Sequence, residues 1–169
     1  MKKIIILLFC AAMTGSVVFA QTTPKIGWLE TADLLAAMPE RAKADSDVAK
    51  YARQFQDEID VMIKEYQTKG QQYQASEKTM TDAMKEVRMK EIQDLQNRIE
   101  STQQSAQEKL QQKKQDVYQP ILDKANKAIQ AVAKEKGYDY VFDKSGGTLL
   151  FGRDGDNILP LVKVHLGIK

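Results

Sequence analysis

Between Pro39 and Pro120 lie 80 residues without proline and with a single glycine, Gly70, and this stretch narrows the choice of folds more than any other part of the sequence. Proline and glycine are the residues that most disfavour a helix interior. Apolar side chains recur at alternating steps of four and three up to Tyr66, with Tyr73 one heptad further, and the pattern resumes at Met80 after an interruption, which is typical of two helices packed along a common seam. The predicted seam positions are Val48, Ala52, Phe55, Ile59, Met62, Tyr66, Tyr73, Met80, Met84, Val87, Ile92, Leu95, Ile99, Thr102, Ala106 and Leu110.

We expect this stretch to form an antiparallel hairpin of two helices, 42–75 and 80–119, with its tip near residues 75–81. Thr79 and Asp82 have the spacing of a weak capping box. Other hydroxyl residues that can cap a helix start here are Ser76 and Thr81. The alternative is one unbroken helix of about 75 residues, which would be roughly 110 Å long and would need a partner throughout. The hairpin is the favoured interpretation.

The surface of the predicted arm, residues 40–119, is strongly polar, because 15 of the 17 glutamines lie between Gln54 and Gln119. A hairpin two helices wide has no interior beyond its seam. The remaining residues, 21–39 and 120–169, must therefore form a small base of about 70 residues, near the size at which a domain is only marginally stable alone.

The base is predicted to mix strands and helices, so the fold class is α+β but mostly α. Its expected elements are a strand at 25–30, a helix at 31–38, a helix at 120–136 ended by Gly137, a β-hairpin of strands 138–143 and 148–151 around Ser145-Gly146-Gly147, and a last helix at 157–166 capped by Asn157. Three short strands leave open edges. Their apolar residues exceed what so small a sheet covers by itself: Ile26, Trp28, Tyr138, Tyr140, Phe142, Leu149 and Phe151. We therefore expect other copies of the chain to complete the base.

The first 20 residues have the pattern of a secretory signal peptide. Lys2 and Lys3 precede an apolar run, and Val18-Phe19-Ala20 places small residues at the usual cleavage positions. We expect cleavage after Ala20; the alternative is an uncleaved anchor, because residues 4–20 approach the length needed to span a bilayer. Export would leave a chain with 23 basic and 23 acidic residues and no cysteine, since Cys10 is the only one.

These counts exclude several classes of function. A chain without cysteine has no disulfide framework, no thiolate metal site and no cysteine nucleophile. Its balanced charge argues against nucleic acid as a partner, and no glycine loop for a nucleotide is present. His165, the only histidine, lacks a convincing ligand set, and Asp154-Gly155-Asp156-Asn157 fails the calcium-loop pattern because Ile158 and Leu159 follow it. We expect no enzymatic activity, no metal and no cofactor.

The order of the predicted segments is distinctive. A leader is followed by a strand of the type Lys25-Ile26-Gly27-Trp28-Leu29 and by a long proline-free hairpin. Gly137–Asp143 (GYDYVFD) then precedes a glycine turn. This order resembles the Skp/OmpH family of periplasmic chaperones over essentially the whole exported chain. The resemblance implies a homotrimer in which strands of three subunits form a small barrel-like core and the helical arms hang from it as tentacles. It also implies that the cavity between the arms holds unfolded outer-membrane proteins in the periplasm of a diderm bacterium without ATP.

Candidate client-binding residues, meaning residues that would contact such an unfolded protein, lie on the arm and its tip. The apolar candidates are Met62, Tyr66, Tyr73, Met80, Met84 and Met89. Flexible thioethers suit promiscuous surfaces, but all of these residues except Met89 also fit the seam, so packing is the competing interpretation. The basic candidates are Lys64, Lys69, Lys78, Lys85, Arg88 and Lys90.

Four acidic residues offset these six basic ones, so the tip is only mildly positive, which predicts at most weak contact with a membrane surface. The competing function is a structural or adaptor coiled coil of the cell envelope without chaperone activity.

Overall fold

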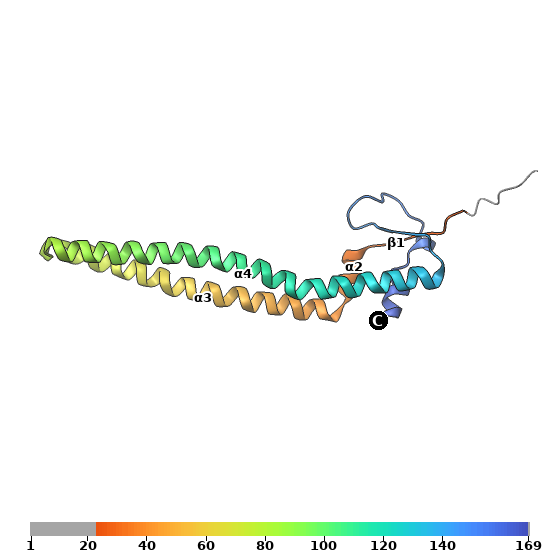
Figure 1. The fold of residues 1–169 in the computed structure, drawn as a ribbon, viewed down its shortest axis with the longest axis horizontal. Coiled ribbons are helices and arrows are strands. Elements are labelled where there is room, and N and C mark those ends of the chain that lie inside the picture. The colour runs from red at the N-terminus through yellow and green to blue at the C-terminus, as the bar shows by residue number, and fades with distance from the viewer. Residues whose placement is uncertain (1–22, 169) are drawn as a thin grey trace, which may run out of the picture.

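The computed structural model describes residues 23–168 and has a long two-helix arm that projects from a small base (Figure 1). The predicted signal peptide lies outside the described residues. In chain order the elements are β1 (Ile26–Leu29), α2 (Thr31–Ala37), α3 (Pro39–Ser76), a 3₁₀ turn (Glu77–Thr79), α4 (Asp82–Lys136), β2 (Tyr140–Asp143), a second 3₁₀ turn (Asp154–Asp156) and α5 (Leu159–His165). The fold is therefore mostly helical with a small pair of strands.

The arm consists of α3 and the first part of α4, which lie side by side and are joined by a tight turn at the tip (Figure 1). The alternative of one unbroken helix is wrong. The cap of α4 is Thr81, whose hydroxyl oxygen accepts a hydrogen bond from the Met84 backbone N–H at 3.3 Å. The expected capping box at Thr79 does not form, because the Thr79 hydroxyl donates instead to the carbonyl oxygen of Ser76.

Helix α4 runs without a break through Pro120, where the sequence predicted that one helix ends and another begins. Pro120 cannot donate the hydrogen bond that would reach the Asp116 carbonyl. The helix continues because buried residues anchor it beyond the proline, at Ile121, Ala125 and Val132. Gly137 ends the helix in a left-handed conformation with φ of 69°, as expected.

The sheet differs from the predicted β-hairpin. Strand β2 pairs in parallel with β1, in the register Ile26 to Tyr140 and Trp28 to Phe142. The turn at residues 144–147 is present, but residues 148–151 do not form a returning strand and instead belong to a loop. The predicted third strand is therefore not formed by residues 148–151. Strand β2 pairs along one edge with β1, and no strand of residues 23–168 pairs with its other edge.

The core of the base lies where α2, α4 and α5 meet one face of the sheet. Leu29, Leu34, Met38, Ala128, Ile158 and Val162 are among its buried members. Gly27 permits this packing, because a Cβ atom there would lie 2.9 Å from the Ile158 side chain and 3.0 Å from the Tyr138 ring. Helix α5 begins two residues after the predicted start, and the Asn157 side-chain oxygen still accepts the Leu159 N–H at 2.9 Å.

Candidate functional site

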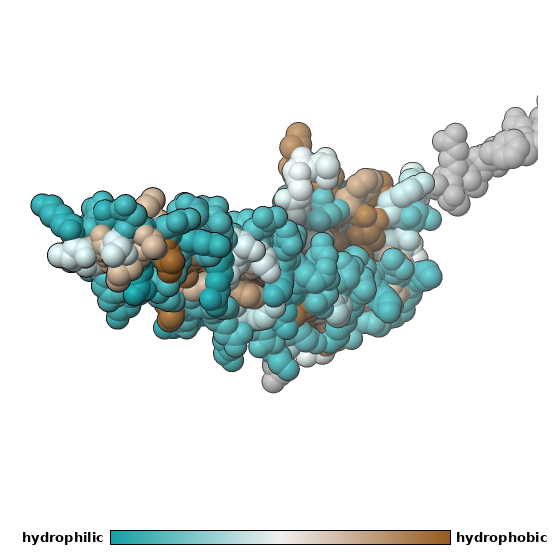
Figure 2. Space-filling view, turned by 60° about the vertical axis from the view of Figure 1, so that its left-hand side comes forward, coloured by the Kyte–Doolittle hydropathy of each residue, from teal (hydrophilic) through white to brown (hydrophobic). Residues whose placement is uncertain are grey.

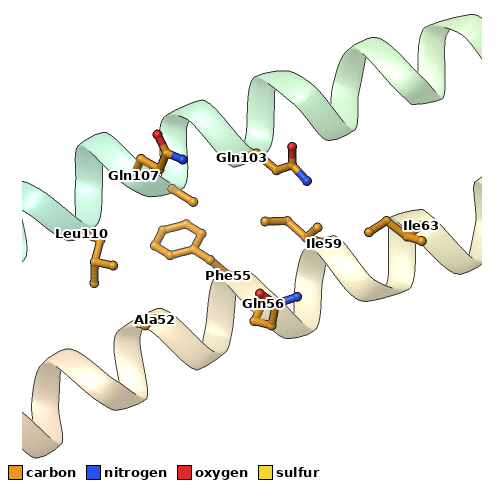
Figure 3. Close-up of a pocket in the computed structure, with 9 residues that line it drawn as sticks. Ala52, Phe55, Gln56, Ile59, Ile63, Gln103, Gln107 and Leu110 are labelled. Carbon is orange, nitrogen blue, oxygen red and sulfur yellow. The ribbon is translucent and has the colours of Figure 1, made fainter.

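The middle of the arm contains a groove of about 400 Å³ between α3 and α4 (Figure 3). Phe55, Ile59 and Ile63 line it from α3, and Ala106 and Leu110 line it from α4. Ile59 and Ala106 belong to the cluster of seam residues that also contains Met62 and Leu95. The seam therefore holds the arm together and still leaves an apolar hollow along one side.

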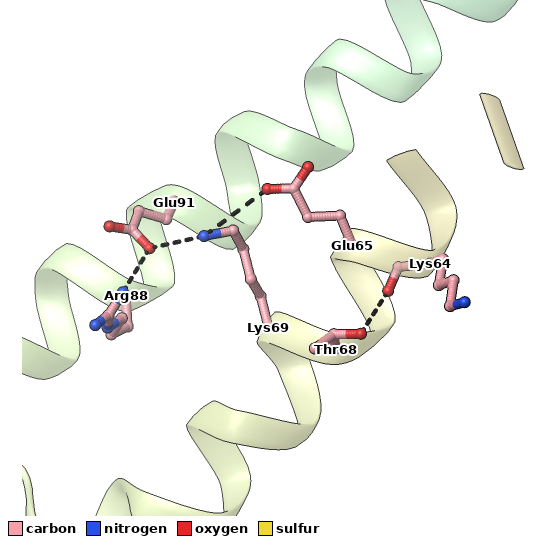
Figure 4. A network of polar contacts seen from close by, with 6 residues as sticks. All are labelled: Lys64, Glu65, Thr68, Lys69, Arg88 and Glu91. Atoms are coloured by element: carbon pink, nitrogen blue, oxygen red, sulfur yellow. Dashed lines mark hydrogen bonds and ion pairs between the residues drawn. The ribbon is translucent and has the colours of Figure 1, made fainter. Parts of the chain in front are cut away.

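The outer part of the arm combines half-buried apolar side chains, such as Tyr66, Tyr73 and Ile92, with an ion pair between the two helices. The Lys69 ammonium of α3 lies 3.3 Å from a carboxylate oxygen of Glu91 in α4 and 3.9 Å from one of Glu65 (Figure 4). The Arg88 guanidinium donates to the same Glu91 oxygen at 3.0 Å. Hydrogen bonds from Arg88 and Lys69 lower the pKa of Glu91. Fully buried apolar residues are absent from the described arm beyond Met62 and before Leu95.

Two of the predicted seam residues near the tip do not lie in the seam. Met84 and Val87 are 51% and 56% exposed. Counting back from Leu95 in steps of three and four reaches residues 92, 88 and 85, so the face of α4 toward α3 carries Lys85 rather than Met84. The predicted pattern contained a step of five between Val87 and Ile92, and this step conceals the shift of register.

The other candidate client-binding residues are dispersed over the arm. Met62 is buried in the seam, whereas Tyr66, Tyr73 and Met80 are half-buried and Met89 is 58% exposed. Lys85 pairs with Asp82 at 3.6 Å, and Lys69 and Arg88 belong to the Glu91 cluster. Lys64, Lys78 and Lys90 are exposed and form no ion pair within residues 23–168. The tip thus combines exposed thioethers with a few unpaired ammonium groups.

The face of the sheet opposite the core is incompletely covered. Ile26, Tyr140 and Phe142 are exposed, and Leu150 and Phe151 in the following loop are 90% and 77% exposed. Figure 2 shows apolar side chains gathered at the base beside the hydrophilic surface of the helices.

Trp28 and Tyr138 differ from the other base residues that the sequence grouped with them. Trp28 is only 7% exposed, because its indole N–H donates to the Arg153 carbonyl at 2.8 Å and Gly152 packs against the ring. Tyr138 precedes β2 and packs on the core side, with the Lys25 ammonium 4.3 Å from its ring centroid. Tyr138 therefore does not share the exposed face of Tyr140 and Phe142, although all three lie in the strand predicted at 138–143. Leu149 is half-buried.

The C-terminal segment holds the polar residues that the sequence analysis considered as ligands. The Asp156 carboxylate pairs with Arg153 at 3.1 Å, and His165 is exposed. Over residues 23–168 no cluster of histidine, cysteine, aspartate and glutamate is placed to hold a metal ion. The same residues include no helix with the length and apolarity required to cross a membrane.

Comparison with known proteins identifies the family. The family model described as outer membrane protein (OmpH-like) matches residues 25–166. The chain belongs to the OmpH-like family. Among solved structures, a candidate outer membrane chaperone (OmpH-like) from Caulobacter crescentus superposes with a TM-score of 0.74 at 14% identity, covering 85% of this chain and 84% of its own. No curated protein matches this OmpH-like chain significantly. At that level of identity the structural similarity establishes a shared fold.

Proposed function

We propose that this OmpH-like protein is an ATP-independent holding chaperone of the periplasm, which binds unfolded outer-membrane proteins between the arms of a homotrimer. The observation that carries the proposal is the uncovered apolar surface of the base, where Ile26, Tyr140 and Phe142 of the strands and Leu150 and Phe151 of the following loop are exposed. An apolar surface of this kind marks an interaction site. Membership of the OmpH-like family supports a chaperone role, and this family is not one of enzymes.

The position of that apolar surface determines which assembly would form if copies of the chain associate through it. Because β1 lies in the base, at the end of the molecule from which the arm projects, copies joined through this face would hold several arms around a common space (Figure 1). Each arm is only two helices thick and encloses nothing alone. Three arms fastened at their roots would form the walls of a container.

The walls of such a container suit many weak contacts rather than one strong site. Each apolar contact with a client contributes on the order of 1 kcal/mol, and contacts along one client raise the effective concentration for the next. Release then needs no nucleotide, because a client that folds into a bilayer withdraws its apolar segments from every contact together.

The test is a light-scattering assay. An unfolded β-barrel membrane protein is diluted from urea into buffer with and without stoichiometric purified protein. The proposal predicts suppressed scattering without ATP. A folded, self-associated protein that leaves the scattering unchanged would contradict the proposal and favour the structural or adaptor role.

A further inference from the structure

We infer that the groove between α3 and α4 binds an extended segment of polypeptide in which apolar and polar residues alternate, as in a membrane β-strand. This inference rests on the proposed function, because it names the surface of the arm on which a client chain would lie. The groove is that of Figure 3, and its volume of about 400 Å³ is within the range of ordinary ligand sites.

The floor of the groove is apolar, and its one aromatic ring packs against a neighbouring ring. Ala52 and Ala106 are small, so the two helices leave a hollow beside Phe55 and Leu110. The ring of Phe55 is held edge-on against the ring of Tyr51, with centroids 5.0 Å apart. An apolar side chain of a bound segment would contact this ring without first ordering it.

The residues that line the groove are uncharged, and the nearest ammonium recorded beside them is that of Lys109, 5.8 Å from the Phe55 ring centroid. By contrast, a hollow near the tip and one at the root of the arm include lysine together with aspartate or glutamate. An uncharged lining suits a ligand whose polar groups are peptide N–H and C=O groups rather than ions. It suits the charged surface of a second arm less well, because burying those charges would be costly.

Ten glutamines lie in α4, and half of them have a hydrogen-bonded side chain within residues 23–168. These five donate to a residue four positions later: Gln93 to Asn97, Gln96 to Glu100, Gln104 to Glu108, Gln112 to Asp116 and Gln119 to Asp123. Two of the other five, Gln103 and Gln107, line the groove. Their amides are therefore available to a ligand as both donors and acceptors.

The spacing of these two amides matches an extended backbone. Residues four apart on a helix are displaced by about 6 Å along its axis. In an extended strand, the peptide groups that point to one side repeat every two residues, or about 6.6 Å. Gln103 and Gln107 can therefore bond peptide groups of alternate residues along one edge of a strand, while the side chains on one face of that strand contact Phe55.

The experiment measures binding of a fluorescein-labelled peptide by anisotropy. The peptide has ten alternating apolar and polar residues with a terminal lysine at each end, and a second peptide of the same composition lacks the alternation. The test variant is Gln103→Glu/Gln107→Glu, which removes both amide donors. The control variant is Gln104→Glu/Gln112→Glu, which adds the same charge to glutamines that already bond within the helix.

We expect the alternating peptide to bind more tightly than the scrambled one. The groove variant should weaken this binding by about fivefold or more, and the control by less than about twofold. Equal effects of the two variants would overturn the inference. So would a protein that suppresses client aggregation yet binds neither peptide, or a groove variant that changes only the oligomeric mass, since the occupant would then be another copy. Failure to suppress aggregation would instead contradict the proposed function.

Discussion

Trp28 and Gly152 form the contact that closes the loop over the sheet. A Cβ atom on residue 152 would lie 2.5 Å from the Trp28 indole nitrogen, which is too close for any side chain. Gly152→Ala should therefore displace the loop and destabilise the protein by about 1–3 kcal/mol. Urea unfolding followed by fluorescence measures this effect, because Trp28 is the only tryptophan.

Gly155→Ala is the matched control for this change, because nothing lies within 4 Å of a Cβ atom at Gly155. We expect its unfolding midpoint to stay within the error of the wild type. Equal midpoints for both alanine variants would show that the loop does not depend on the contact between Gly152 and Trp28.

At the residue scale, the sequence predicted which kinds of side chain lie near the tip but not which way they face. Met84 and Met89 are both exposed, although only Met89 was expected off the seam. The seam was predicted correctly at Ile59 and Leu95, because both residues are apolar and both follow the steps of three and four. Near the tip Lys85 and Glu91 are half-buried on the inner face, and no hydropathy pattern marks such positions.

At the scale of the element, the tip of the arm depends on the ion cluster that joins α3 to α4. Glu91 has a lowered pKa when folded, so its stabilising effect is present above its unfolded pKa of about 4.3 and is lost as pH falls through the folded value. We predict that amide protection factors across residues 66–92 fall when pH is lowered from about 6 to 3.5.

Glu91→Gln should remove much of that pH dependence and lower protection already at pH 6. Glu86→Gln provides the control, because Glu86 is exposed and has no ion pair within residues 23–168. The same pH dependence in the wild type and in the Glu91 variant would contradict a role for this cluster in closing the tip.

Pro120 lies inside helix α4 and lowers the stability of that helix. A proline inside a helix removes one hydrogen bond and destabilises the helix by about 3 kcal/mol relative to alanine. Pro120→Ala should stabilise the protein by about 1–2 kcal/mol, because the gain is offset in part by the greater entropy of the unfolded chain. A lower free energy of unfolding for this variant, measured with urea, would contradict the account.

The errors at the element scale share one physical cause. Proline predicted a helix end at residue 120, and Ser145-Gly146-Gly147 predicted a returning strand, from local signals alone. Buried contacts on both sides of Pro120 override the first signal. Instead of forming the hairpin that the glycine turn predicts, β2 pairs in parallel with β1, which is more than 100 residues away in the sequence. Contacts over such separations leave no local mark in a sequence.

For the whole molecule, the exposed face of the sheet is predicted to join copies of the chain. Phe142→Asp places a charge on that face and should lower the oligomeric mass of the purified protein, while circular dichroism stays strongly helical because Phe142 lies outside the monomer core. Val61→Asp alters another exposed apolar residue, on α3, and should leave the mass unchanged. Equal oligomeric masses for the two variants would show that this face is not part of the interface.

We propose that slender arms become a container only when their roots are joined. Sedimentation equilibrium of the purified, exported chain at micromolar concentration measures whether they are joined. We expect a particle of three chain masses. A stable particle with the mass of a single chain would contradict this proposal.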